Sequence, residues 1–132
     1  MPDAPRKLAA IVSIDIVGYS ALAERDAAEA LAHVARVRDL AGAAATAHGG
    51  RIFNTAGDGL MLEFASASDA LIASIVLCQR ERDAQLRFGV HMAAVTQTEA
   101  GDLLGHGVNV AARLQAEATA GAILISEIIR QN

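Results

Sequence analysis

The sequence predicts an α/β protein of the α+β type, with a ferredoxin-like βαββαβ core followed by an appended helix and strand. Short apolar runs rich in β-branched residues are bounded by glycines, as strands are, and two longer stretches carry apolar residues at helical spacing. The first six elements follow the order strand, helix, strand, strand, helix, strand. Since 132 residues make one ordinary domain, we expect residues 1–132 to form a single domain.

The first strand is expected at Lys7 to Ile16, an apolar run that ends near Asp15 and is followed by Gly18. A helix should begin at Asp26, which has Glu29 three residues later, and should stop at Gly49-Gly50. Its apolar residues recur at intervals of four and three, which predicts one buried face: Ala30, Val34, Val37, Ala41 and Ala44.

Two short strands, Arg51 to Thr55 and Leu60 to Phe64, are joined by AGDG, which is typical of a tight hairpin. Ser66, with Asp69 three residues on, is the N-terminal signal of a second helix over about 67–82. Apolar residues at helical spacing support that helix, namely Leu71, Ile72, Ile75 and Val76.

The fourth strand is predicted at Leu86 to Val95, and the polar segment TQTEAGD after it should be a loop. A third helix is expected over Gly105 to Glu117, ended by Gly121, and a last strand over Ala122 to Ser126.

Composition argues against several classes of partner. The net charge is -4 with a pI near 5.5, and Lys and Arg do not cluster, which disfavours binding to nucleic acid or to anionic membranes. Cys78 is the only cysteine, so a reducing compartment fits best. No apolar run approaches the roughly 18 to 20 residues of a membrane span, so we expect a cytoplasmic protein with no direct membrane insertion.

Two acids stand where strands end or turn: Asp15 after the first strand and Asp58 in the hairpin. The first and third strands of this fold are neighbours, so the two carboxylates could face each other across one edge of the sheet. Paired carboxylates repel unless a cation separates them, and Mg²⁺ or Mn²⁺ prefers oxygen ligands. The alternative is that Asp15 caps the next turn and Asp58 only shapes the hairpin.

The segment DIVGYS adds a turn at Gly18, Tyr19 and Ser20 that leads toward a helix, whose backbone N–H groups could hold a phosphate. Arg87, at the start of the fourth strand, would be another phosphate contact, unless it is a solvated edge residue.

Asn109 and Arg113 are four residues apart and therefore share one face of the predicted third helix. An amide beside a fixed cation suits an anionic transition state, although such a pair is also common on a helix surface. The histidines match no metal motif and none adjoins a Ser or Cys nucleophile, so we interpret them as structural or surface groups: His33, His48, His91 and His106.

Four segments in register, DIVGYS, NTAGDG, LRFGVH and DLLGHGVNVAARL, resemble the catalytic domain of class III adenylate and guanylate cyclases. The resemblance runs from about Lys7 to Ser126. It implies a homodimer with composite sites that convert ATP, or alternatively GTP, to the cyclic nucleotide and pyrophosphate with two divalent metal ions, Mg²⁺ or Mn²⁺. Asp15 and Asp58 match the two metal-binding aspartates, and Ile16 matches the residue whose backbone carbonyl also reaches a metal.

The same resemblance implies that Asn109 and Arg113 of the partner subunit steady the ribose and the transition-state phosphate. Arg87 matches a phosphate-contacting arginine, and Asp102 matches a position that recognises the purine in adenylate cyclases. Asn54 stands where adenylate cyclases carry Lys and guanylate cyclases Glu. It leaves open relaxed ATP/GTP specificity, or a weak or silent cyclase-like module that binds nucleotide as a regulatory element.

Two further departures concern length. The family domain continues for several tens of residues beyond the segment that matches ILISE, so this chain is C-terminally short relative to the family. The segment CQRERDAQLRF is shorter than the arm that often helps the family to dimerise.

Overall fold

The computed structural model describes residues 5–56, 59–81 and 85–131. Its elements, in chain order, are β1 (Arg6–Ile16), α1 (Tyr19–Arg25), α2 (Ala27–Ala47), β2 (Arg51–Ala56), β3 (Gly59–Phe64), α3 (Ala67–Arg80), β4 (Leu86–Gln97), β5 (Leu103–Leu104), α4 (His106–Glu117), β6 (Ile123–Ile125) and α5 (Glu127–Arg130).

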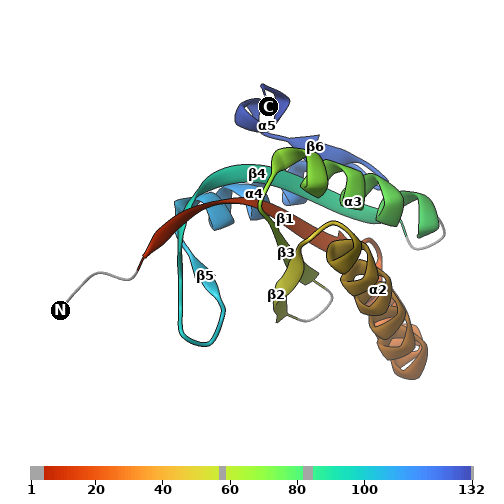
Figure 1. Ribbon diagram of the computed structural model, residues 1–132. Coiled ribbons are helices and arrows are strands. Elements are labelled where there is room, and N and C mark those ends of the chain that lie inside the picture. Colours follow the sequence, from red (N-terminus) through yellow and green to blue (C-terminus); the bar gives the residue numbers. More distant parts are fainter. Residues whose placement is uncertain (1–4, 57–58, 82–84, 132) are drawn as a thin grey trace.

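One sheet organises the domain (Figure 1). Its strand order is β2-β3-β1-β4-β5, and β6 pairs with β4 in parallel. The strand β1 lies between β3 and β4 and is antiparallel to both. The first and third strands are therefore neighbours, and the predicted ferredoxin-like βαββαβ core with an appended helix and strand is confirmed.

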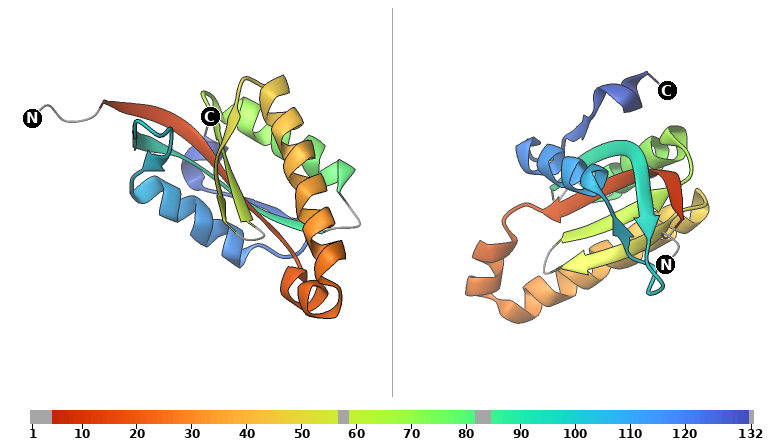
Figure 2. Two further views of the ribbon diagram at one scale, coloured as in Figure 1. Left: turned by 90° about the horizontal axis from the view of Figure 1, so that it is seen from below. Right: turned by 90° about the vertical axis from the view of Figure 1, so that its left-hand side faces the viewer.

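The helices lie on both faces of the sheet (Figure 2). α2 and α3 cover one face, where the main core gathers around large buried side chains such as Phe64, Phe88, Leu62 and Leu77. α4 covers the other face and packs on β4 and β1. A second, smaller apolar cluster on that side includes Ile11, Val95 and Ala111.

The two long helices begin where their capping signals predict. Asp26 accepts a hydrogen bond from the Glu29 amide at 3.1 Å, and Ser66 accepts one from the Asp69 amide at 3.1 Å. All five residues predicted for the inner face of α2 are buried. Small side chains on that face let α2 lie close to the sheet.

α3 is a helix as predicted, but it ends at Arg80 rather than near 82, and two of the apolar residues that support the prediction, Ile72 and Ile75, lie outside its buried face. Ile72 and Ile75 are 46% and 47% exposed. The residues buried against the sheet are mostly small, namely Ala67, Ala70, Ala73, Ser74 and Leu77. Small side chains at four of these five positions let the helix lie close to the sheet.

Three short elements were not predicted: α1, β5 and α5. The strand β5 has two residues, α5 has four and α1 has seven, so each is too short to repeat its hydrophobic pattern enough times to be recognised. β5 lies just after the predicted loop and pairs with the end of β4, which is two residues longer than expected.

α4 is held against the sheet at Gly89 of β4. A Cβ atom there would lie 2.2 Å from the Ala111 carbonyl oxygen and 2.3 Å from the Gln115 amide nitrogen. Only glycine permits this approach of the helix backbone to the strand. Gly89 therefore sets where α4, with Asn109 and Arg113, lies over the sheet.

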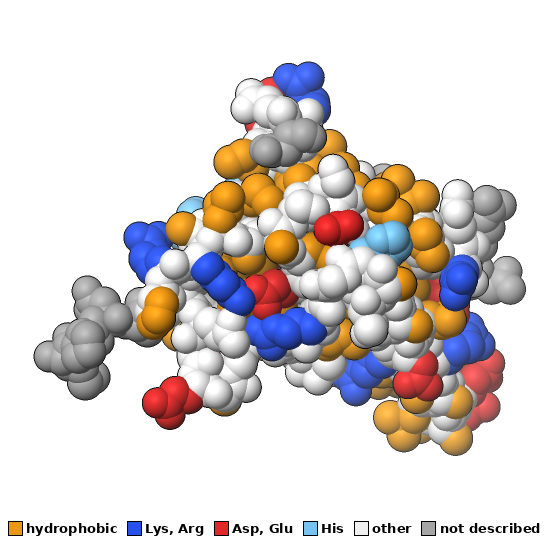
Figure 3. All heavy atoms as spheres, viewed as in Figure 1, with side chains coloured by type: hydrophobic (Ala, Val, Ile, Leu, Met, Phe, Trp, Pro, Cys, Tyr) orange, Lys and Arg blue, Asp and Glu red, His pale blue; other side chains and the backbone are white. Residues whose placement is uncertain are grey.

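The face shown in Figure 3 intersperses acidic and basic side chains with apolar ones. Among the residues that the structure describes, no helix is both long enough and apolar enough to cross a bilayer.

Candidate functional site

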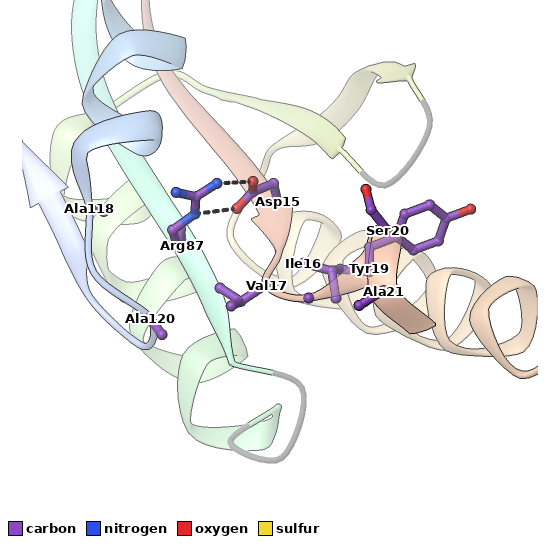
Figure 4. Close-up of a pocket in the computed structure, with 10 residues that line it drawn as sticks. Asp15, Ile16, Val17, Tyr19, Ser20, Ala21, Arg87, Ala118 and Ala120 are labelled. Carbon is purple, nitrogen blue, oxygen red and sulfur yellow. Dashed lines mark hydrogen bonds and ion pairs between the residues drawn. The ribbon is translucent and has the colours of Figure 1, made fainter. Parts of the chain in front are cut away.

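One pocket lies where β1 ends, and Asp15 and Arg87 meet in it (Figure 4). These two residues are direct partners in the register of β1 and β4. Arg87 Nε lies 3.0 Å from Asp15 Oδ1, and the Arg87 Nη2 atom lies 2.5 Å from Asp15 Oδ2. The pocket has a volume of about 440 Å³. A carboxylate and a guanidinium thus share one partly solvated cavity.

The predicted turn follows β1, and its residues line one side of this pocket. Gly18 has φ of +78°, a left-handed conformation that suits glycine, and it precedes the first residue of α1. Gly18, Tyr19 and Ser20 all line the pocket. The Tyr19 ring points away from the Asp15–Arg87 pair, so the backbone of this residue, rather than its ring, faces the pocket (Figure 4).

Asp58, the second predicted metal ligand, lies outside the described residues, so the Asp15–Asp58 juxtaposition stays a prediction. Ile16 lines the same pocket as Asp15. Asp15 already holds a cationic group with both carboxylate oxygens, and a carboxylate with a neighbouring carbonyl is the oxygen donor set that Mg²⁺ or Mn²⁺ takes. The residues present fit a divalent ion, although the described ranges hold no group of three or more His, Cys, Asp or Glu side chains suited to a metal.

A second set of predicted residues meets elsewhere on the face that α4 covers, between β2 and the segment before β5. Asn54 on β2 and Asp102 before β5 are 48 residues apart in the chain, and Asn54 Nδ2 lies 3.5 Å from Asp102 Oδ1. This is a long contact, and both groups remain open to solvent. Asp102 Oδ1 also accepts a hydrogen bond from the Leu103 amide at 2.8 Å.

A β-bulge brings Asn54 to this position. The register of β2 with β3 runs from Ile52 opposite Leu62 to Asn54 opposite Met61, and Phe53 is the extra residue. Residues opposite each other in a sheet point to the same face, so Ile52 faces the core while Asn54 faces away from it. Asn54 then lines a groove with Ser13, Val108 and other residues of β1, β3 and α4.

Asn109 and Arg113 lie on the exposed side of α4, one turn apart as predicted. An Arg113 guanidinium nitrogen lies 3.5 Å from His106 Nε2. Neither residue is among the described residues that line the Asp15 pocket. The structure therefore does not bring this pair to Asp15 within one chain.

His91 lies on β4, and its Nδ1 atom is 2.8 Å from Ser126 Oγ. Partial burial, together with the nearby His106, lowers the pKa of His91. This contact links β4 to the beginning of α5, in keeping with the structural interpretation of the histidine.

Sequence reasoning missed the ion pairs around Glu63. This residue of β3 is mostly buried, and its carboxylate meets Lys7 Nζ at 2.6 Å and Arg51 Nε at 2.7 Å. No spacing in the sequence signals this cluster, because its members come from three strands.

The fold and the pocket define a ferredoxin-like domain with a carboxylate–arginine pair beside a backbone turn, an arrangement suited to a phosphate with its metal ion. No family model matches the chain. The chain is 39% identical over 139 residues to a putative adenylate cyclase 3 from Rhizobium meliloti (strain 1021), covering 96% of this chain and 23% of that protein. It is 31% identical over 116 residues to an adenylate cyclase from Streptomyces coelicolor, covering 84% of this chain and 30% of that protein.

The chain thus spans between a fifth and a third of the length of these curated relatives. Among solved structures, an adenylate/guanylate cyclase/hydrolase from Silicibacter pomeroyi is 36% identical, with a TM-score of 0.86 over 98% of this chain and 81% of that one. The chain therefore belongs to the adenylate/guanylate cyclase family, as a class III nucleotide cyclase domain.

Proposed function

We propose that this domain converts ATP to cyclic AMP and pyrophosphate at sites shared between two copies of the chain. The observation that carries the proposal is the Asp15–Arg87 pair in its pocket beside the turn at Gly18, in a chain 36% identical to a cyclase-family structure. In the proposed reaction the ribose 3′-oxygen forms a bond to the α-phosphorus. The bond to the bridging oxygen breaks, pyrophosphate leaves with the electron pair, and the hydroxyl proton passes to solvent.

Asp15, the Ile16 carbonyl and Asp58 would hold two divalent ions, Mg²⁺ or Mn²⁺. When bound, such ions lower the pKa of the attacking hydroxyl and offset the charge of the triphosphate. Arg87 stands beside Asp15 and can turn its guanidinium to a phosphate oxygen in the same cavity. Gly18, Tyr19 and Ser20 line the same pocket, and their backbone N–H groups would be further donors to a phosphate.

The purine would lie against Asp102 and Asn54, since these side chains meet at the edge of an open groove. A carboxylate accepts a hydrogen bond from the 6-amino group of adenine and repels the 6-oxygen of guanine. Asn54 can donate to N1 of adenine or accept from N1–H of guanine, so it discriminates less than Lys or Glu would. Asp102 would therefore favour ATP over GTP, and Asn54 would add little to that discrimination.

Asn109 and Arg113 of the partner subunit would steady the ribose and the charge on the α-phosphate. Their exposure on α4, away from the Asp15 pocket of their own chain, supports this division of one site between two copies. In a symmetric dimer each exposed pair would serve the other chain, giving two sites per dimer.

A second candidate function is a cyclase-like module that binds nucleotide without turnover. The observation that favours it is the engagement of both Asp15 oxygens by Arg87, because this ion pair competes with a metal ion for the carboxylate.

The test is to incubate the purified chain with ATP or GTP and Mn²⁺ while measuring cyclic nucleotide and pyrophosphate. The variant Asp15→Asn should abolish turnover. Asp26→Asn is the matched control, because Asn caps a helix as well as Asp does, and it should retain wild-type activity. Nucleotide binding without any product would refute the enzyme and support the module.

A further inference from the structure

We propose that Arg51 is a positioning residue for purine recognition: it fixes the loop that carries Asp102 and thereby sets the preference between ATP and GTP. This inference rests on the proposed function, because it concerns how Asp102 is presented to the base. It assigns Arg51 no contact with the nucleotide.

Arg51 connects two parts of the fold that are far apart in sequence. Its Nε atom donates to Glu63 Oε1 at 2.7 Å, and its Nη2 atom donates to the Gly101 carbonyl oxygen at 2.6 Å. Its guanidinium carbon also lies 6.0 Å from the centre of the Phe53 ring. A planar guanidinium with two separate donors can satisfy both partners at once, whereas the single ammonium of lysine is a point donor on a flexible chain.

A hydrogen bond to the Gly101 carbonyl affects the position of Asp102 directly, because Asp102 is the next residue. The loop closes on itself through the Gly101 amide, which donates to the Thr98 carbonyl at 3.0 Å, and the Thr98 amide, which donates to the Asp102 carbonyl at 2.9 Å. Those bonds fix the shape of the loop but not its place relative to β2. Within the described ranges, two hydrogen bonds join the loop to β2: the short Arg51–Gly101 contact and the long Asn54–Asp102 contact.

The β-bulge explains why the same strand supplies both contacts. Arg51 and Asn54 are three residues apart, so in a regular strand they would point to opposite faces. Because Phe53 is extra, Arg51 opposes Glu63 while Asn54 opposes Met61, and both side chains point to the face where the loop lies. Arg51 thus sets the distance of the loop from the strand that carries Asn54.

The effect of Arg51 on the loop can be measured apart from its effect on the stability of the fold, because Glu63 has a second cationic partner. The Glu63 side chain is 11% exposed, so losing every cation beside it would be costly. Lys7 Nζ remains 2.6 Å from its other carboxylate oxygen when Arg51 is replaced. The variant Arg51→Gln therefore loses the Gly101 bond without leaving a buried charge unpaired, and it should fold.

The variants to compare are Arg51→Gln, Arg51→Lys and the matched control Lys7→Gln. The last removes a cation from the same Glu63, together with the Lys7–Gln97 contact at the end of β4, and leaves the Arg51–Gly101 bond in place. Two quantities are measured on the 132-residue chain. One is amide hydrogen exchange over residues 98–103, and the other is the dissociation constants of 3′-deoxy-ATP and 3′-deoxy-GTP with Mn²⁺, which bind without the attacking hydroxyl.

In both Arg51 variants we expect faster exchange over residues 98–103 and an ATP-to-GTP affinity ratio lowered by roughly three- to tenfold, the net contribution of one typical hydrogen bond. In turnover the loss should appear in KM for ATP rather than in kcat. Lys7→Gln should leave the ratio and the loop exchange as in wild type.

Unchanged exchange in Arg51→Gln, or equal changes in Arg51→Gln and Lys7→Gln, would overturn the inference. An unchanged affinity ratio in a wild-type chain that discriminates ATP from GTP would overturn it as well, while leaving the proposed function intact. If the wild-type chain binds neither 3′-deoxy nucleotide, the proposed function fails and the inference fails with it.

Discussion

Replacing Arg87 by alanine should weaken the metal-free domain and strengthen its binding of Mn²⁺. Arg87 holds both oxygens of Asp15, at 3.0 Å and 2.5 Å, and donates to the Ala116 carbonyl oxygen at 3.3 Å. A divalent ion that binds Asp15 must displace this guanidinium or share the carboxylate with it. The ion pair therefore competes with the metal, and its removal favours the metal.

The magnitude follows from the exposure of the pair. The side chains of Arg87 and Asp15 are 32% and 18% exposed, between the surface and the interior. Exposed pairs contribute about 0 to 1 kcal/mol and breaking buried ones costs about 3 to 5 kcal/mol, so we expect a loss of about 1 to 2 kcal/mol in unfolding free energy without metal. The same energy released to the metal would tighten Mn²⁺ binding by roughly five- to thirtyfold.

The assay is urea unfolding in EDTA, together with calorimetric titration of Mn²⁺ into wild type and Arg87→Ala. The double variant Asp15→Asn/Arg87→Ala is the control and should lose the gain in affinity. Equal or weaker Mn²⁺ binding by Arg87→Ala would show that the guanidinium does not compete with the metal for Asp15, and would refute the reasoning.

Three other predictions concern the packing of α4, the proposed purine site and the protonation of His91. Gly89→Ala should lower the unfolding free energy by about 1 to 3 kcal/mol and reduce turnover, because its Cβ would collide with the backbone of α4. Gly42→Ala is the control: its Cβ would meet one atom at 3.7 Å, so it should change neither stability nor turnover. Equal effects of the two variants would contradict the role of Gly89 in placing α4. Asn54→Lys should raise the ATP-to-GTP ratio of kcat/KM by roughly tenfold, as expected for one charged hydrogen bond, and an unchanged ratio would remove residue 54 from the purine site. The lowered pKa of His91 means that the folded state favours its neutral form, so the stability contributed by His91 should be full above about pH 6.5 and should fall as the pH drops below that value. Thermal melts of His91→Asn at several pH values should show a smaller loss of stability at low pH than wild type. Parallel pH profiles of the melting temperature would refute the role of His91.

The order of the main elements could be predicted because each carries a local signal. The α2 face repeats over about four turns, and both long helices have an N-cap residue that uses its side chain as expected. The chain order of strands and helices then led to the correct sheet topology. The inner face of α3 could not be predicted from apolar spacing alone, because small residues were buried in place of Ile72 and Ile75.

The candidate site was predicted as residue identities and not as contacts. Asp15 and Arg87 are 72 residues apart, and their pairing depends on the register of β1 and β4, for which no local pattern exists. No sequence pattern indicates the bulge at Phe53 either, yet the bulge places the side chains of Arg51 and Asn54 on the same face of the sheet. The single-domain boundary and the cytoplasmic location stay predictions.

The most direct test of a shared nucleotide cyclase site is a mixing experiment with two inactive variants, Asp15→Ala and Arg113→Ala. Each homodimer lacks one component in both of its sites, whereas a mixed dimer has one site with Asp15 from one copy and Arg113 from the other. Random pairing of equal amounts should restore about a quarter of the wild-type cyclic AMP production, since half of the dimers are mixed and each has one intact site of two. Cyclic AMP production that stays at the level of the separate variants, with mixed dimers verified by differently tagged chains, would contradict the proposal.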